Sequence, residues 1–134
     1  IPRWVSLRSD EVDGRRGPGK DYAPLYIYHV RGLPVQVVEE TTDWRRICDP
    51  EGGVAWVHRS MLAARRTVMA RQGAAAILHR EPNAASPPTG RLASGALADV
   101  RSCTADWCEV LVDGRSGWTP QSSLWGAASV AVCQ

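Results

Sequence analysis

Four cysteines and three histidines are the side chains of this sequence best suited to act as nucleophiles, bases or soft metal ligands. Cys103 and Cys108 form a Cys-x4-Cys pair, but no second pair completes a zinc site and the histidines stand alone. Cys48 and His58 flank the hairpin segment DPEGG and could approach each other, yet no third residue is placed to orient them. We therefore expect no metal, no cofactor and no catalytic activity.

The aromatic residues are better candidates for function, because the sequence has six tryptophans and no phenylalanine. Trp44 and Trp107 each follow an aspartate directly, at the expected tip of a hairpin, where a ring is poorly covered and can stack on a ligand. Trp56 and Trp118 each come just after a turn that contains glycine, and we expect them to pack partly against the core.

A segment rich in Gly and Pro, VDGRRGPGKDY (12–22), is long enough to form one wall of a groove. Its Arg15 and Tyr22 have two interpretations: they contact a ligand, or they anchor the loop through its carbonyls and beneath its backbone. Flat rings with charged groups at the rim suit an extended peptide or a glycan. The expected ligand-binding residues are Arg15, Tyr22, Asp43, Trp44 and Trp56.

One phrase occurs twice in the chain, as DWRRICDPEGGVAWVHRSML (43–62) and DWCEVLVDGRSGWTPQSSLW (106–125). Trp44 and Trp107 are 63 residues apart, and the segments that precede them match at the same offset. Self-similarity of this kind predicts two units of about 60 residues. We place the first domain at residues 1–65, and the second domain with a C-terminal tail at 66–134.

The second unit repeats the groove only in part. It keeps Trp107 and Trp118 as a secondary groove, but Ser86 stands at the place of Tyr22 and the Gly17-Pro18 corner is lost. We expect any ligand to bind mainly to the first unit, with the second serving as a brace.

The elements that must position these residues are short strands. Segments 25–30, 34–40, 44–48 and 54–58 are rich in Val, Ile, Tyr and Trp and are separated by turn residues. We expect only a turn of helix at 59–62 and 121–124, and a short linker near 63–67. Five or six short strands in so small a unit can close into a barrel, which removes exposed edges. The prediction is an all-β fold of two tandem small barrels.

Composition excludes several classes of protein. A net charge of +2, from 16 basic and 14 acidic residues, is too small for a dedicated nucleic-acid-binding protein. No apolar run approaches the roughly 18 residues of a membrane span. The start of the sequence, IPRWVSLRSD, lacks the layout of a secretory signal, and we expect that a signal peptide has been removed.

The cysteines suggest two disulfides. An even number of cysteines in a short chain favours an oxidising compartment. At the offset of 63, Cys103 and Cys108 lie over Glu40 and Arg45, whose opposite charges suggest a cross-strand pair. We predict a Cys103–Cys108 disulfide and, as its complement, a Cys48–Cys133 disulfide that ties the tail back to the first unit. The alternative is that all four thiols are free.

The loop phrase VDGRRGPGKDY (12–22), together with GLPVQVVEETTDWRRI (32–47) and GGVAWVHRSML (52–62), resembles a known family. This family is the bacterial Src-homology-3-like domains, found in tandem in proteins exported to the cell envelope. Their counterparts in the second unit, such as RSGWTPQSSLW (115–125), extend the resemblance over nearly the whole chain. One departure is Gly14, which stands where the family usually has an apolar residue.

The resemblance implies a periplasmic or secreted module that binds a peptide or peptidoglycan rather than an enzyme. A second hypothesis is a structural or assembly role, in which the domains dock on a protein partner through outer Trp and Arg residues. An enzyme or a nucleic-acid-binding protein is the third and weakest alternative. We expect a monomer that contains no membrane span.

Overall fold

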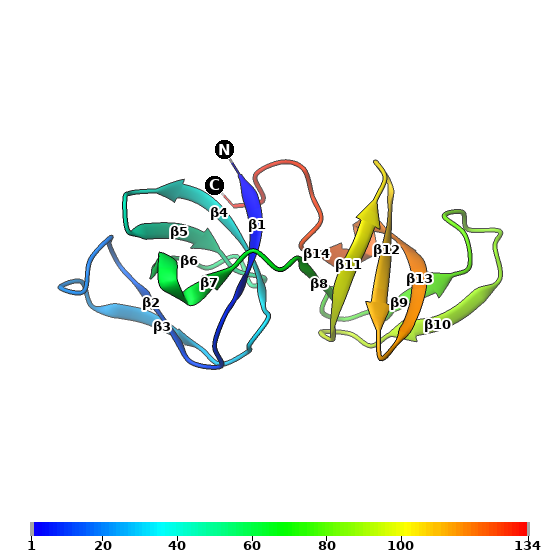
Figure 1. The fold of residues 1–134 in the computed structure, drawn as a ribbon, viewed down its shortest axis with the longest axis horizontal. Coiled ribbons are helices and arrows are strands. Elements are labelled where there is room, and N and C mark those ends of the chain that lie inside the picture. The colour runs from blue at the N-terminus through cyan, green and yellow to red at the C-terminus, as the bar shows by residue number, and fades with distance from the viewer. Residues whose placement is uncertain (1, 134) are drawn as a thin grey trace. The chain divides into compact units, whose positions relative to one another are not determined.

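The computed structural model describes residues 2–133, which fold almost entirely into strands (Figure 1). The chain divides into two compact units, one holding the residues up to Arg66 and the tail from Ala128, the other Thr67–Ala127. Each unit contains a 7-stranded antiparallel sheet. The predicted all-β fold of two tandem domains is confirmed.

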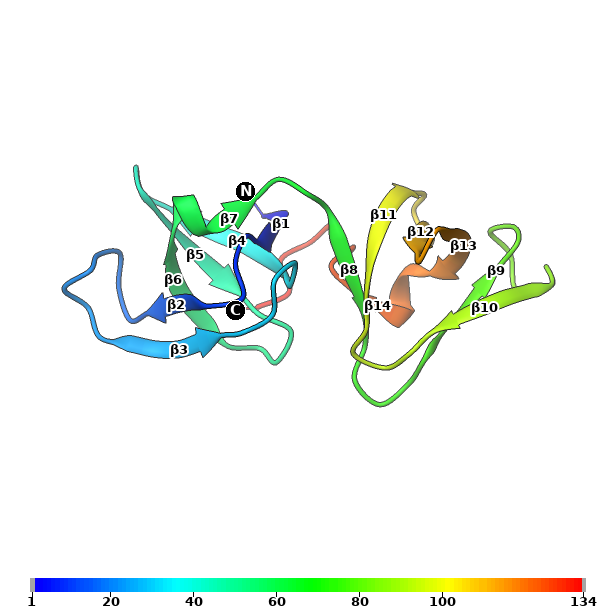
Figure 2. The same cartoon turned by 60° about the horizontal axis from the view of Figure 1, so that its bottom comes forward.

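The first domain has its strands in the order β3-β2-β6-β5-β4-β1-β7. A single turn of 3-10 helix, η1 (Arg59–Met61), connects its last two strands. Figure 2 shows the β2–β3 hairpin on the opposite side of the domain from β4, so the bent sheet wraps around its own core. The strands are β1 (Arg3–Leu7), β2 (Val12–Arg15), β3 (Pro24–Tyr28), β4 (Pro34–Glu40), β5 (Trp44–Cys48), β6 (Val54–His58) and β7 (Leu62–Ala63).

The second domain repeats this topology in the order β10-β9-β13-β12-β11-β8-β14, with a 3-10 turn η2 (Gln121–Ser123). Its alanine-rich stretch, residues 73–88, forms a strand followed by a loop. The strands are β8 (Thr67–Ala70), β9 (Ala76–His79), β10 (Pro88–Leu92), β11 (Leu97–Cys103), β12 (Trp107–Val112), β13 (Arg115–Pro120) and β14 (Leu124–Trp125).

Neither sheet closes into a complete barrel, which corrects one detail of the prediction. The order of strands in the first domain runs from β3 to β7 without returning, so β3 is an edge strand, and β10 has the same place in the second domain. The two end strands, β3 and β7, do not pair with each other among residues 2–133, and β2 and β6 share a single register pair, Arg15 with Trp56. The sheet therefore bends strongly but keeps two edges.

Alternation along β6 separates core from surface. Ala55 and Val57 are buried, whereas Val54, Trp56 and His58 lie on the outer face and are partly exposed. The tip tryptophan Trp44 pairs in register with His58 and so lies on this outer face too. The fully buried side chains of the first domain include Leu7, Val12, Val35, Val37, Ile47 and Val57.

Gly14, the departure from the family pattern, is explained by packing between β2 and β6. A Cβ at Gly14 would lie 2.8 Å from the Cβ of Ala55 and 2.9 Å from Cε2 of Tyr28. In the second domain the roles are exchanged, because a Cβ at Gly117 would lie 2.7 Å from the Cβ of Leu78. Each pair of crossing strands thus has one glycine at its closest approach, on opposite strands in the two domains.

The C-terminal tail packs on the first domain, although the predicted division placed residues 66–134 together. The indole nitrogen of Trp4 donates to the carbonyl of Ala128 (2.7 Å). The buried Gln36 amide donates to the carbonyl of Val130 (2.8 Å) and accepts from the backbone of Val132 (2.9 Å). The buried side-chain amide of Gln36 cannot bond to water, so it needs protein partners for its hydrogen bonds. The tail supplies these partners and completes this face of the domain.

The phenol of Tyr28 gives the first domain a pH dependence. Burial raises the pKa of Tyr28 above its ordinary value of 10.0, and its hydrogen bond to Asp49 raises this pKa further. The folded state therefore favours the neutral phenol. Stability is fully present below pH 10 and falls as the pH rises further, because the unfolded chain then ionises more readily.

We expect the free energy of unfolding of the first domain to decrease above pH 10, by at most about 1.4 kcal/mol per pH unit from this one group. Urea unfolding at pH 8, 10 and 11 will measure the decrease, and the Tyr28→Phe variant should lack this contribution. An identical alkaline decrease in parent and variant would contradict the assignment to Tyr28.

Candidate functional site

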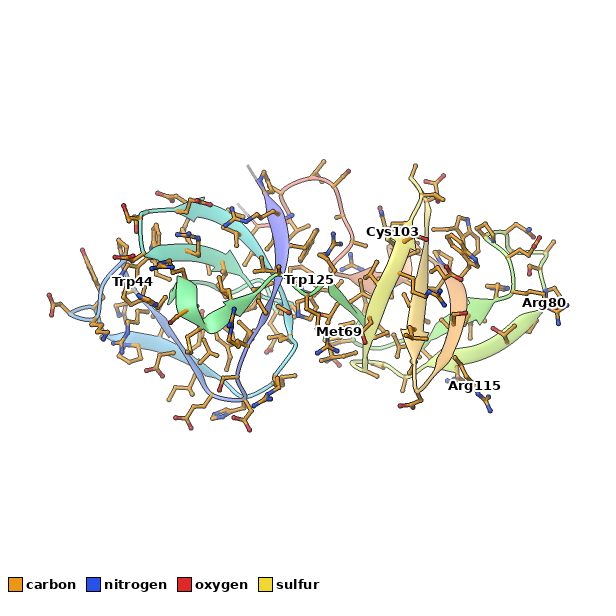
Figure 3. The ribbon with its side chains drawn as sticks, in the orientation of Figure 1. Trp44, Met69, Arg80, Cys103, Arg115 and Trp125 are labelled. Carbon is orange, nitrogen blue, oxygen red and sulfur yellow. A yellow bond between two sulfur atoms is a disulfide. The ribbon has the colours of Figure 1, made fainter. Side chains whose placement is uncertain are left out.

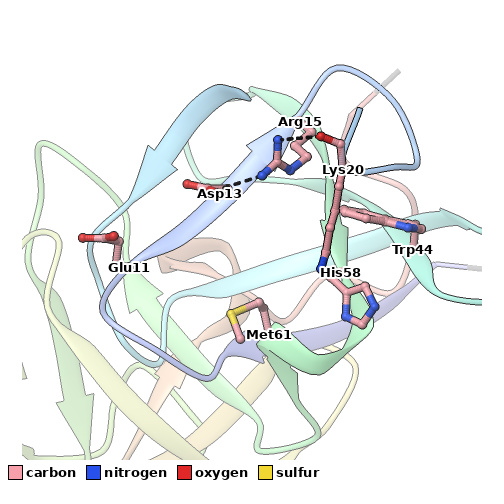
Figure 4. A pocket seen from close by; sticks show the side chains of 7 residues that line it. All are labelled: Glu11, Asp13, Arg15, Lys20, Trp44, His58 and Met61. Atoms are coloured by element: carbon pink, nitrogen blue, oxygen red, sulfur yellow. Dashed lines mark hydrogen bonds and ion pairs between the residues drawn. The ribbon is translucent and has the colours of Figure 1, made fainter. Parts of the chain in front are cut away.

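A hollow of about 170 Å³ opens on the outer face of the first domain (Figure 4). It lies where β2 and β6 separate beyond their single register pair. Residues from β2, the following loop, the tip of the β4–β5 hairpin, the end of β6 and η1 meet there. The lining residues are Glu11, Asp13, Arg15, Lys20, Trp44, His58 and Met61.

Trp44 is held rigidly at the rim of this hollow. Its backbone nitrogen donates to Oγ1 of Thr41 (3.1 Å), and its carbonyl accepts from the backbone nitrogen of Thr41 (2.9 Å). Its ring meets the ring of His58 edge to face, with centroids 5.2 Å apart. The Nδ1 atom of His58 lies 2.7 Å from Oγ of Ser60, which fixes the imidazole in turn. The indole is therefore preorganised for stacking.

Arg15 shapes the loop wall of the hollow. Its Nη1 donates to the carbonyls of Tyr22 (2.9 Å) and Lys20 (3.4 Å), and its Nη2 lies 3.4 Å from the carboxylate of Asp13. These bonds match the loop-anchor interpretation of Arg15, although the residue also lines the hollow. Figure 4 shows the side chain of Lys20 running from this loop between Arg15 and Trp44.

Of the five residues expected to bind a ligand in the first domain, the structure brings Arg15 and Trp44 together in this hollow. Tyr22 is 49% exposed, but its ring covers its own loop: a Cβ at Gly17 would lie 2.5 Å from it. Trp56 is half-buried on the same outer face, outside the hollow. Asp43 is exposed and pairs with Arg59 at 3.2 Å.

Sequence reasoning missed five of the lining residues, Glu11, Asp13, Lys20, His58 and Met61. His58 had a usable signal, because it lies directly across the β5–β6 hairpin from Trp44. Glu11, Lys20 and Met61 had none, since their approach depends on how the first loop and η1 fold over the sheet. The rim that they form carries a negative side chain, Glu11, and a positive one, Lys20. Neither has an ion pair within residues 2–133.

The second domain builds a related but different arrangement around Trp107. Thr104 holds Trp107 as Thr41 holds Trp44, with Oγ1 accepting from the backbone nitrogen at 3.1 Å. His79 occupies the position of Arg15: it pairs in register with Trp118, and its Nδ1 lies 2.9 Å from the carbonyl of Ser86. The His79 ring meets Trp107 edge to face at 5.7 Å. An imidazole thus replaces the guanidinium beneath the loop.

The structure contains both expected disulfides, Cys48–Cys133 and Cys103–Cys108. Cys103 and Cys108 are direct cross-strand partners, and Glu40 and Arg45 share the corresponding register in the first domain. Glu40 forms its ion pair with Arg3, which holds the pKa of the carboxyl below its usual range. Two disulfides fit an oxidising compartment.

Among the described residues, no group of three or more His, Cys, Asp or Glu side chains is placed to hold a metal ion. In the same part of the chain no helix has the length and apolar character needed to cross a membrane.

Comparison with known proteins gives one family and several solved structures, two of which are NlpC proteins. The sequence model of the bacterial SH3 domain matches residues 8–63 and again residues 72–126. NlpC2 from Trichomonas vaginalis is 10% identical with a TM-score of 0.42, over 93% of this chain and 48% of that chain. NlpC1 from the same organism is 8% identical with a TM-score of 0.44, over 98% and 49%. The chain spans about half the length of these two proteins, and no curated protein matches it.

Proposed function

This chain belongs to the bacterial SH3 domain family and carries the domain twice, and on that premise we propose that it is a non-catalytic binding module of the bacterial cell envelope. Domains of this family are binding modules. The proposed ligand is an extended peptide or a peptidoglycan fragment held in the hollow of the first domain. The proposed location is periplasmic or secreted, supported by the two disulfides.

The observation that carries this proposal is the fixed indole of Trp44 above a rim of mixed charge. Its backbone is held by Thr41 and its ring packs against His58, so little side-chain entropy is lost when a flat or apolar ligand group stacks on it. Glu11 and Lys20 stand on the same rim without ion pairs in the described part of the chain. A peptide that carries both an amino and a carboxyl group complements this rim.

Replacing Trp44 by alanine tests the proposal. We expect the affinity of the purified chain for cell-wall sacculi to fall about tenfold, because an aromatic contact contributes about 0.5–1.5 kcal/mol beyond its burial. The matched control is Trp107→Ala, at the same hairpin position of the second domain, which should retain most of the binding. Co-sedimentation with sacculi gives the affinities, and circular dichroism checks that both variants fold.

Equal losses from the two changes, or a loss from Trp107→Ala alone, would move the site away from the first domain. If the parent protein fails to sediment with sacculi but still binds a soluble peptide, the hypothesis of a peptide ligand is kept and that of cell-wall binding is rejected.

Docking on a protein partner is a second candidate function, and one observation favours it. The edge strand β3 carries large apolar and aromatic side chains that are about half exposed, with Leu25 at 38%, Tyr26 at 43% and Ile27 at 53% exposure. Exposed apolar edge strands are commonly covered by a partner. Capture of a defined envelope protein without retention on sacculi would favour this function over the first.

A further inference from the structure

A second hollow, of about 420 Å³, lies on the second domain, away from Trp107. It opens between the edge strand β10 and the tip of the β12–β13 hairpin. Its volume falls in the range of about 300–1,000 Å³ that is common for small-ligand sites. The lining residues are Leu78, Thr89, Gly90, Arg91, Val112, Asp113, Arg115 and Ser116.

Comparison of the two domains explains why this space is open. Tyr26 pairs in register with Gly14 in the first domain, and Gly90 pairs with Leu78 at the same place in the second. The ring of Tyr26 lies close to the β5–β6 hairpin, since a Cβ at Gly53 would be 3.2 Å from its Cε2. Gly90 has no side chain to fill the corresponding space. The hollow therefore lies at the place that the partly exposed ring of Tyr26 occupies in the other repeat.

The charges around the hollow are of one predominant sign. Arg91 and Arg115 both line it, and neither has an ion pair or a side-chain hydrogen bond among residues 2–133. Figure 3 shows Arg115 reaching outward from the start of β13. Guanidinium groups bind carboxylates in a planar, bidentate way. Unpaired arginines beside an open hollow favour an anionic ligand.

The remaining lining residues narrow the class of ligand. Leu78 is buried and Val112 half-buried, so part of the lining is apolar. Asp113 stands in the two-residue turn at the tip, with φ of 50°, and offers an acceptor at the same rim. A carboxylate, an apolar body and an amide N–H together describe the last residue of a peptide.

We propose that this hollow binds the carboxyl-terminal residue of a peptide. The carboxylate pairs with Arg91 and Arg115, the apolar side chain rests on Leu78 and Val112, and the peptide N–H donates to Asp113. The site is separate from the hollow at Trp44 and does not depend on the function proposed for it.

The test uses acetyl-Ala-Ala-Leu as a free acid and as its C-terminal amide, titrated into the full ¹⁵N-labelled chain and followed by NMR. We expect the acid to shift the signals of residues 89–92 and 112–116, and the amide to bind about tenfold more weakly, since a charge-assisted pair is lost. Sodium acetate serves as the control for a bare carboxylate and should shift these signals only at far higher concentration.

Gly90→Tyr is the decisive variant, because it places in the second domain the residue that the first domain has. A Cβ at Gly90 meets only Cδ1 of Leu78, at 4.0 Å, so the backbone accepts a side chain there. We expect this variant to fold and to lose binding. Arg115→Gln should bind about tenfold more weakly, whereas Arg101→Gln, an exposed arginine on β11, should bind as the parent does.

Three results would overturn the proposal: equal affinity for acid and amide, unchanged binding by Gly90→Tyr, or signal shifts that map outside this hollow. Should Gly90→Tyr fail to fold, as its NMR spectrum would show, Arg91→Gln replaces it, and unchanged binding by that variant would be equally decisive. Loss of sacculus binding by Trp44→Ala has no bearing on any of these outcomes.

Discussion

Replacing Cys133 by serine should cost the protein about 4–5 kcal/mol of unfolding free energy, the largest effect that we expect from a single change. The Cys48–Cys133 disulfide joins residues 85 apart, so it restricts nearly two thirds of the unfolded chain. The loop-closure relation gives about 4.6 kcal/mol for a loop of this length when the whole chain unfolds. Cys48 is fully buried and remains behind as a small apolar thiol, so the substitution itself opens little space.

Cys103→Ser is the matched control, because it also removes a more exposed partner and leaves a fully buried cysteine, Cys108, in place. Its disulfide spans a separation of only 5 residues. The same relation then gives about 2.2 kcal/mol, half the effect of the long loop. Urea unfolding followed by tryptophan fluorescence measures both variants, with and without reductant.

The tail contacts add to the effect of Cys133→Ser. Once untethered, the segment from Ala128 must hold its place by the hydrogen bonds of Trp4 and Gln36 alone. If it detaches, the buried amide of Gln36 exchanges protein partners for water. A loss from Cys133→Ser no greater than that from Cys103→Ser would show that the tail closes no large loop in solution.

The fold was predictable from the sequence because the sequence pattern of one domain occurs twice in the chain. The phrase around Trp44 and Trp107, with its preceding threonine and its following glycine turn, sets a hairpin whose register is the same in both domains. The pairing of Cys103 with Cys108 belongs to the preceding hairpin, β11–β12, and followed from the opposite charges of Glu40 and Arg45 at the same register of β4–β5. Local patterns of this kind can be recognised from neighbouring residues alone.

The lining of the hollow at Trp44 was only half predictable, for a physical reason. Tyr22 is an aromatic residue in a loop, as many ligand-binding residues are, but its ring covers Gly17 within its own loop. The sequence pattern does not show how a loop folds on itself. The sequence also did not predict that the glycine at the closest approach lies on β2 in the first domain (Gly14) and on β13 in the second (Gly117). This placement depends on which strand of a crossing pair carries the larger side chain, and that is visible only when the two strands are placed together.

We expect Asp49→Ala to destabilise the first domain by about 3–4 kcal/mol, the second-largest effect. Asp49 is 6% exposed, and its Oδ1 accepts from the backbone nitrogens of Glu51 and Gly53, both at 2.9 Å. Its Oδ2 accepts from the hydroxyl of Tyr28 at 2.8 Å. Alanine leaves three donors without a partner, and each hydrogen bond to a charged acceptor contributes about 1.5–3 kcal/mol, less where water can replace it.

Asp49→Asn separates these bonds. Its amide oxygen can still accept from the turn of residues 49–53, but its amino group offers a donor to Tyr28, so we expect a loss of about 1–2 kcal/mol. A double-mutant cycle of Asp49→Ala with Tyr28→Phe should give a coupling energy of about 1–2 kcal/mol. Additive losses in that cycle would show that the turn, rather than the phenol, is what Asp49 stabilises.

The position of Asp49 also separates stability from binding. Trp44 begins β5 and Asp49 directly follows its end, so the strand lies between the turn and the hollow. Because no lining residue of that hollow contacts Asp49 through a hydrogen bond, the folded fraction of Asp49→Asn should bind sacculi with the affinity of the parent. Trp44→Ala should show the reverse, with weaker binding and nearly unchanged unfolding. A parallel loss of both properties in both variants would mean that the ligand binds to a surface that includes the 49–53 turn.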